Sequence, residues 1–226
     1  MYTERPSSLP HVVAWQSVTP VGASEHRILP DGCLDIIWQD GSVFVAGPDT
    51  TAQVGAPVPG SRHHALRFGA GTGPGVLGLP ASEVLDQRVP LDALWPADEV
   101  RRIAEATNPA AALQEAATRR WHDPDPVMVA VSAAAHDDRP VTEIASAAGL
   151  GERQLRRRSV AAYGYGPKTL HRIFRMRRAV ALARAGRAFA EVAADTGYAD
   201  QAHLSREVKA LAGVPLGGLM SQADAA

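Results

Sequence analysis

Two short segments of the chain carry side chains suited to contact nucleic acid: Arg153, Arg156 and Arg157 in the first, and Gln201, His203 and Arg206 in the second. Arginine can donate two hydrogen bonds to guanine, glutamine can pair with adenine, and both can contact phosphate. We expect each set to lie on the outward face of a helix. The sequence therefore predicts two helices that contact the edges of DNA bases.

A helix-turn-helix pattern surrounds the second segment. A short apolar helix around Val192 precedes Gly197, and glycine suits a turn because it enters the left-handed backbone region without a steric penalty. Asp200 stands where a helix N-cap belongs, and the helix after it turns Leu204 and Val208 inward. Two helices that meet closely at a steep angle are expected here.

The same order occurs earlier in the chain, over 141–160. An apolar stretch at Ile144 precedes Gly149, and a helix with Leu155 facing inward follows. The turn glycines, Gly149 and Gly197, lie 48 residues apart. Two copies of one pattern at a fixed spacing are a more specific signal than a single copy.

A long helix is expected between the two patterns, from Pro167 to Ala185. Proline suits the first turn of a helix, and Gly186 follows its end. Such a helix would be about 28 Å long at 1.5 Å per residue. That length can hold two recognition helices near one DNA turn apart, roughly 34 Å, so one monomer could contact two successive major-groove segments.

These motifs together resemble the AraC/XylS family of transcription regulators. The residues that carry the resemblance are Glu143-Ile144-Ala145, Gly149-Leu150, Gln154-Leu155-Arg156-Arg157 and Gly197-Tyr198-Ala199-Asp200-Gln201-Ala202-His203-Leu204-Ser205-Arg206. The resemblance implies a DNA-binding domain with two helix-turn-helix units over 126–220. It places the residues that contact double-stranded DNA at Arg153, Gln154, Arg156, Arg157, Gln201, Ala202, His203 and Arg206.

The sequence departs from the family pattern at three places. Ser159 and Val208 stand where the family usually has phenylalanine, and Gly213-Val214-Pro215-Leu216 only approximates the family's Gly-x-Thr-Pro. Losing a core aromatic side chain destabilises a domain unless neighbours refill the space. We therefore expect the first unit to be packed more loosely than the second.

The charge is distributed unevenly along the chain. The net charge is −1, but residues 139–212 hold fourteen Lys or Arg and six Asp or Glu, a net charge of +8, which leaves −9 for the remainder. A basic segment joined to an acidic one is expected if only the first contacts phosphate.

The composition sets further bounds. The 226 residues are enough for two modest domains. No apolar run of membrane-spanning length occurs and the N-terminus does not resemble a signal peptide. A single cysteine, Cys33, fits a reducing compartment, so we expect a cytoplasmic protein.

The N-terminal part is predicted to be rich in short strands: around Val12–Trp15, up to Trp38 after the Pro30-Asp31-Gly32 turn, and over Ser42–Gly47, Gln53–Val58 and His63–Phe68. Asp40-Gly41 is a hairpin signal. Short strands between Gly and Pro turns favour a small β-sandwich or barrel. The expected fold class is α+β, with this β-rich domain followed by an all-α double helix-turn-helix domain.

This part also resembles the small β-rich domain that precedes some AraC-type modules. The residues that carry the resemblance are Leu29-Pro30-Asp31-Gly32-Cys33-Leu34-Asp35, Gly47-Pro48-Asp49-Thr50 and Leu66-Arg67-Phe68. The resemblance implies an effector-sensing or dimerising role, without indicating the ligand.

Helices are predicted over Pro80–Gln87, over Pro96–Arg120 and, as the first of the DNA-binding domain, over Pro126–His136. The proline-rich segment from Trp121 to Pro126 is a predicted linker. The expected domains are therefore 1–122 and 126–220.

Three other motifs have both a chemical and a structural interpretation. Gly73 to Gly78 matches G-x-G-x-x-G but lacks the βαβ context of a dinucleotide site, which favours a loop entering a helix. His26, His63 and His64 could ligate a metal, but adjacent residues on a strand point to opposite faces. Cys33 has acidic neighbours that disfavour a reactive thiolate, which favours structural burial.

The sequence therefore predicts a transcription regulator that binds double-stranded DNA and responds to a small-molecule effector. The family resemblance adds contact with RNA polymerase and homodimer formation as expected partners. No cofactor, metal or catalytic residue is expected. The alternative is an enzyme or DNA-repair protein with an AraC-like tail, but repair proteins of that type use a cysteine-rich metal site, and this chain has one cysteine.

Overall fold

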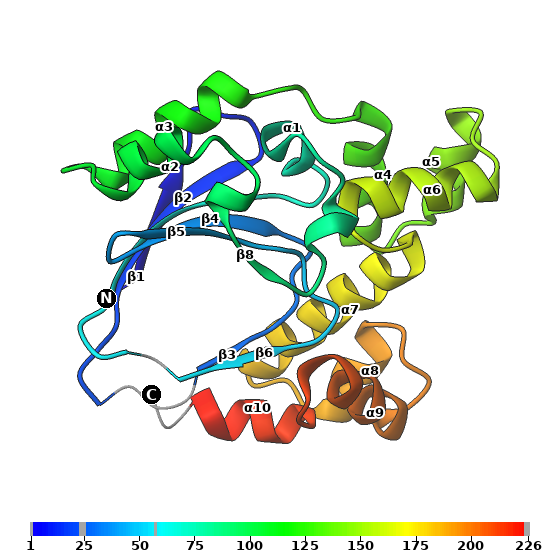
Figure 1. Cartoon of the computed structure of the whole chain (residues 1–226). Coiled ribbons are helices and arrows are strands. Elements are labelled where there is room, and N and C mark those ends of the chain that lie inside the picture. Colours follow the sequence, from blue (N-terminus) through cyan, green and yellow to red (C-terminus); the bar gives the residue numbers. More distant parts are fainter. Residues whose placement is uncertain (1, 23–25, 57, 224–226) are drawn as a thin grey trace.

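The computed structural model describes residues 2–22, 26–56 and 58–223, and Figure 1 shows the whole chain. Its strands are β1 (Tyr2–Pro6), β2 (Val12–Val18), β3 (His26–Ile28), β4 (Leu34–Gln39), β5 (Ser42–Ala46), β6 (Gln53–Gly55), β7 (Arg62–Phe68) and β8 (Arg88–Pro90). Its helices are α1 (Pro74–Leu77), α2 (Ala97–Ala104), α3 (Pro109–Arg120), α4 (Pro126–His136), α5 (Val141–Ala147), α6 (Glu152–Tyr163), α7 (Pro167–Arg184), α8 (Phe189–Asp195), α9 (Gln201–Ala212) and α10 (Leu216–Ala223). The α+β fold class is confirmed.

The strands form a six-stranded antiparallel sheet, in the order β1-β2-β7-β4-β5-β8, and a separate two-stranded ribbon, β3-β6. The predicted Asp40-Gly41 hairpin joins β4 to β5, and both residues have positive φ, 45° and 93°. Such values fit a two-residue turn whose twist matches that of the flanking strands. Figure 1 shows the β3-β6 ribbon on the side of the sheet away from α2 and α3.

One face of the sheet packs against α2 and α3. Ile36, Leu66 and Phe68 lie on the same face of β4 and β7, and their side chains are almost fully buried. They share a core with Leu113 on α3 and Ile103 on α2. The period of two along the strands therefore places one apolar face against the helices.

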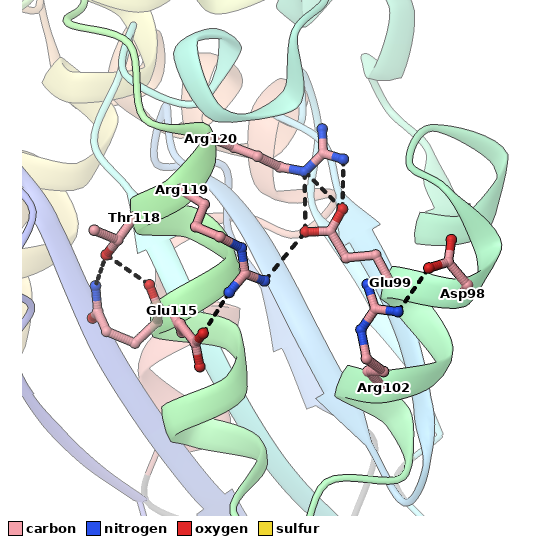
Figure 2. A network of polar contacts seen from close by, with 8 residues as sticks. Asp98, Glu99, Arg102, Glu115, Thr118, Arg119 and Arg120 are labelled. Carbon is pink, nitrogen blue, oxygen red and sulfur yellow. Dashed lines mark hydrogen bonds and ion pairs between the residues drawn. The ribbon is translucent and has the colours of Figure 1, made fainter.

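Ion pairs join α2 to α3 on the outer side of this layer (Figure 2). Glu99 near the start of α2 accepts hydrogen bonds from Arg120, at 2.6 Å, and from Arg119, at 3.5 Å. The guanidinium of Arg120 also lies 4.3 Å from the ring centre of Trp95. The Arg120 hydrogen bond is the main cause that holds the pKa of Glu99 below its usual range. The acidic start of one helix is thus tied to the basic end of the other.

A second core surrounds α7. Its side chains Leu170, Ile173 and Met176 are fully buried. They pack with residues from α4, α6, α8 and α9. Figure 1 shows α7 running between two groups of helices, α4 to α6 on one side and α8 to α10 on the other. One long helix therefore carries both helix-turn-helix units.

Several predicted boundaries differ from the structure. The helix predicted over Pro96–Arg120 is divided into α2 and α3, because residues 105–108 are not helical and Asn108 caps the start of α3. The helix predicted over Pro80–Gln87 is wrong: a 3₁₀ turn spans only Ala81–Val84, and strand β8 follows. Asp86, at φ 56°, reverses the chain there, and its carboxylate accepts hydrogen bonds from Thr50. The strand predicted over Gln53–Val58 ends at Gly55 as β6, and residue 57 lies outside the described residues.

Candidate nucleic-acid interface

The turns of the two helix-turn-helix units have the same backbone hydrogen bonds. In the first unit Leu150 donates to the carbonyl of Ala145, at 2.8 Å, and in the second Tyr198 donates to Ala193, at 2.9 Å. The glycine before each donor has positive φ, 67° at position 149 and 72° at position 197. The predicted turns are thus confirmed, because a residue in the left-handed region lets the chain close the preceding helix.

The helices that follow the turns are equivalent at a spacing of 49 residues. Leu155 and Leu204 are the buried residues four positions after the N-caps. Both helices end at a glycine in the left-handed region, Gly164 and Gly213. Since the turn glycines are 48 residues apart, the second turn is one residue longer before its helix begins.

The outward face of α6 carries the residues predicted in the first unit. Arg153, Gln154, Arg156 and Arg157 are all exposed. Within the ranges that the structure describes, Arg153, Arg156 and Arg157 form no ion pair. The Gln154 side chain accepts a hydrogen bond from the backbone nitrogen of Gly151, at 3.2 Å, so it also caps the helix. The three guanidinium groups are free to meet phosphate or a base edge.

The start of α9 presents Gln201, Ala202 and Arg206 to solvent. His203 differs, because its side chain is half-buried and its ring meets the Tyr198 ring edge-on at 5.4 Å. Its Nδ1 accepts a hydrogen bond from the backbone nitrogen of Ala199, at 3.3 Å. Only the other side of the imidazole can therefore serve an outside partner.

The Asp200 N-cap is confirmed. Its carboxylate accepts a hydrogen bond from the backbone nitrogen of His203, at 2.6 Å. This contact satisfies one of the helix's free amide groups and fixes where α9 begins. Asp200 therefore helps to determine which residues of α9 face the solvent.

A groove of about 1010 Å³ lies between the two units along the first half of α7. Cationic side chains line it, and sequence reasoning assigned none of them a contact: Arg139, Lys168, Arg172 and Arg175. Glu207 of α9 pairs with Arg172 at 2.9 Å, and this hydrogen bond is the main cause that lowers the pKa of Glu207. Part of the positive charge counted in the sequence is thus used to hold α9 on α7. Lys168 is exposed at the groove.

The other motifs have structural roles. Across the described ranges, no group of three or more His, Cys, Asp or Glu side chains is placed to hold a metal. His64 packs on Trp38 in the sheet's helix-covered face, and His63 approaches the Ser17 hydroxyl at 3.3 Å on the other face. The predicted opposite orientation of this pair is confirmed. The side chain of His26 lies outside the described residues.

The Gly73–Gly78 motif and Cys33 also have structural roles. A Cβ on Gly75 would lie 2.2 Å from the carbonyl oxygen of His122, so this glycine lets α1 pack against the segment before α4. Burial raises the pKa of the Cys33 thiol well above its usual value, and the carboxylates of Asp31 and Asp35 raise it further. Neither feature favours cofactor binding or a reactive thiolate.

Comparison with known families finds one match in each part of the chain. Residues 133–222 match a family described as a helix-turn-helix domain, and residues 9–90 match a domain of unknown function, DUF6597. Residues 133–222 are therefore similar to AraC-type helix-turn-helix domains. Neither match supports the alternative of an enzyme or DNA-repair protein with an AraC-like tail. No curated protein matches the chain.

Three solved structures, of two proteins, are similar to the chain. A probable AraC family transcriptional regulator from Rhodopseudomonas palustris is 17% identical over 44% of this chain and 98% of its own, with a TM-score of 0.39. Apo ToxT from Vibrio cholerae is 11% identical over 96% of this chain and 99% of its own, with a TM-score of 0.49. ToxT with bound unsaturated fatty acid is 11% identical over 92% of this chain and 94% of its own, with a TM-score of 0.45. In the described part of this chain, none of the helices could cross a bilayer.

Proposed function

We propose that this protein is a transcription regulator in which one monomer reads two successive major-groove segments of double-stranded DNA. The observation that carries the proposal is the pair of equivalent helices, α6 and α9, which follow the same turn and border the same groove along the first half of α7. Both present exposed polar side chains from their first turns. We expect a preferred site with two short boxes about 10 bp apart on one face of the DNA.

The two helices would read different bases. The exposed face of α6 carries Arg153, Arg156 and Arg157, and arginine fits the O6 and N7 atoms of guanine. The exposed face of α9 carries Gln201 and Arg206, so its box would contain an adenine paired with the glutamine. Ala202 offers a methyl group for contact with thymine, and Gln154 and His203 act mainly by capping their own helices.

The test is selection of binding sites from random duplex DNA with the purified full-length protein. We expect two boxes, and inserting roughly 5 bp between them should abolish binding because the boxes then lie on opposite faces. Undiminished binding to the lengthened site would show that only one of the two helices contacts the bases. Failure to select any duplex sequence would overturn the proposed function.

Substitutions then assign each box. Gln201→Ala and Arg206→Ala should weaken preference in one box, and Arg153→Ala and Arg157→Ala in the other, by about 1–3 kcal/mol for a side chain that reads a base. A phosphate contact would instead weaken binding to all sequences and lower its salt dependence. Arg101→Ala is the matched control, since Arg101 is exposed on α2 of the other core. An equal effect of Gln201→Ala on both boxes would contradict the assignment.

We further propose that residues 1–122 form an effector-sensing domain and 126–220 the DNA-binding domain. The support is the two separate hydrophobic cores and the charge split. The sheet face opposite α2 and α3 carries a polar cluster in which the Trp15 indole donates to Asp35 at 2.6 Å and Arg67 donates to it at 3.2 Å. Burial raises the pKa of Asp35 to about 6, against the lowering effects of Arg67 and Trp15. An aromatic ring beside charged groups suits a small polar ligand.

The domain proposal is tested by limited proteolysis of the full chain, which should cut first between residues 121 and 126. A screen of small molecules for a rise in melting temperature tests effector binding, with Trp15→Ala and Arg67→Ala as variants that should lose the response. Contact with RNA polymerase and homodimer formation are tested by transcription in vitro and by sedimentation. Resistance of the linker to protease would count against the boundary.

A further inference from the structure

The β-rich part of the chain touches both recognition helices at equivalent positions. The last residue of α6 and its C-cap, Tyr163 and Gly164, correspond to Ala212 and Gly213 of α9 at the spacing of 49 residues. All four positions contact elements between residues 27 and 85. The two contacts differ in chemistry.

The contact with α6 is apolar. A Cβ on Gly164 would lie 2.9 Å from Leu85 and 3.2 Å from Pro48, and one on Gly71 would lie 2.9 Å from the ring of Tyr163. Both glycines therefore let the six-stranded sheet's loops approach the end of α6 closely. Apolar packing of this kind has no directional requirement.

The contact with α9 is made by hydrogen bonds from the two-stranded ribbon. The Arg27 guanidinium on β3 donates to the carbonyl of Ala212, at 2.9 Å, and the backbone nitrogen of Ala52, just before β6, donates to the carbonyl of Leu211, at 2.7 Å. The last carbonyls of a helix lack partners within it, and a cation near them is favoured by the helix dipole. The β3-β6 ribbon of the N-terminal part thus caps the end of α9, a helix of the second core.

The geometry points to Arg27 as a positioning residue for DNA reading, placed in the β-rich part and acting through α9. Hydrogen bonds fix both distance and direction, so the ribbon determines where the end of α9 lies. The end of α6 rests on a different element, the loops of the six-stranded sheet. The separation of the two recognition helices is therefore set by the ribbon and the sheet together, in addition to α7. This inference rests on the proposed reading of two DNA boxes.

Arg27 would therefore affect the preferred distance between the two DNA boxes and not the base sequence that each box requires. Arg27 lies at the opposite end of α9 from Gln201, so it does not contact the bases that α9 reads. A change in the ribbon would move the second recognition helix relative to the first. The protein would then tolerate other distances between the boxes while keeping the sequence of each.

The first test is hydrogen exchange of the full-length protein without DNA. Arg27→Met removes the guanidinium and keeps an unbranched side chain, and we expect amides of α9 to exchange about tenfold faster, the change expected from losing one hydrogen bond to a charged donor. Amides of α6 should be unchanged, and Arg27→Lys should retain part of the protection. Arg5→Met, an exposed arginine on β1, is the control.

Two outcomes of that test would overturn the proposal. One is unchanged protection of α9 in Arg27→Met. The other is an equal loss of protection in α6 and α9, which would show that the substitution only destabilises the whole chain. Both outcomes are independent of DNA binding, so they are distinct from a failure of the proposed function.

The second test measures spacing preference on the sites selected by the wild-type protein. One base pair added to or removed from the spacer rotates one box against the other by about a tenth of a turn. We expect the ratio of affinities for the best spacing and its neighbours to fall at least about threefold in Arg27→Met, to recover in Arg27→Lys, and to stay unchanged in Arg5→Met. An unchanged ratio in Arg27→Met would overturn the proposal.

Discussion

The two helix-turn-helix units share a turn but are held by different neighbours. In the first, Arg158 of α6 pairs with Asp125, the N-cap of α4, and the hydroxyl of Tyr163 donates to the carbonyl of Met128. In the second, the residue equivalent to Arg158 is Glu207, which pairs with Arg172 of α7. The recognition helix thus contributes the basic partner in the first unit and the acidic partner in the second, and it is joined to α4 in the first and to α7 in the second.

The comparison shows which features each helix-turn-helix unit determines by itself and which features depend on the neighbouring elements. The turn glycine and the inward leucine act within one unit and both copies keep them, whereas the N-cap residue differs, Gly151 in the first and Asp200 in the second. The placement of each recognition helix depends on partners from α4, α7 or the β-rich part. Two copies of one motif can therefore be positioned by unrelated contacts.

The largest effects should come from the equivalent leucines. Leu155 and Leu204 are 4% and 1% exposed. Leu155→Ala and Leu204→Ala should each lower the free energy of unfolding by about 2–5 kcal/mol, because a buried leucine leaves a cavity. Urea denaturation followed by circular dichroism measures this. A loss below about 1 kcal/mol at Leu155 alone would show that the first unit is not packed around its leucine.

A smaller effect is expected at Ser159, which stands where the resemblance places a phenylalanine. Ser159 is fully buried, and its hydroxyl lies 4.0 Å from the sulfur of Met128. Because Met128 and Tyr163 occupy the surrounding space, Ser159→Phe should overpack the core and destabilise the protein by about 1–3 kcal/mol. Ser159→Ala, as the control, should change the stability by less than about 1 kcal/mol.

Those two substitutions also test the expectation of loose packing in the first unit. If Ser159→Phe raised the melting temperature, space for the aromatic ring would exist and the prediction of a looser unit would be confirmed. A loss of stability would show that Met128 and Tyr163 refill the site. The equivalent residue in the second unit, Val208, is also fully buried.

The sequence predicted the local features of both units and missed those that depend on distant partners. The turns at Gly149 and Gly197 and the cap at Asp200 were predictable because the signals lie within a few residues. The half-burial of His203 was not, since it depends on how Tyr198 packs. The contact of Arg27 with α9 joins residues 185 positions apart, and no local pattern marks it.

The β-rich part shows the same limit. The β4-β5 hairpin was predicted from Asp40-Gly41 because the turn itself demands these residues. The three-residue strand β8 was not, because it exists only through its pairing with β5. The segment before it was predicted to be helical, and Asp86 instead reverses the chain there.

A modest effect is expected from the N-cap of the second unit. Asp200→Ala removes the acceptor for the His203 amide and should cost about 1 kcal/mol of unfolding free energy. Asp200→Asn keeps an acceptor oxygen and should cost less. Measured by urea denaturation, an equal loss in both variants would mean that the negative charge at the helix start, rather than the hydrogen bond, supplies the stabilisation.

The smallest effect should come from giving the first unit the kind of cap that the second has. Gly151 is the N-cap of α6, with φ −71° and ψ 163°, and a Cβ there would meet nothing within 4 Å. Any residue can adopt this backbone conformation, so Gly151→Ser introduces no strain. Its hydroxyl can accept from the amide of Gln154, whose side chain already accepts from the backbone nitrogen of Gly151.

The expected gain from Gly151→Ser is a few tenths of a kcal/mol, the difference between a serine and a glycine cap. Gly151→Ala is the matched control, because it restricts the unfolded chain in a similar way but supplies no acceptor. The urea midpoints of the three proteins measured side by side give the difference. If alanine stabilised the protein as much as serine, the gain would come from the restricted unfolded chain and not from capping of α6.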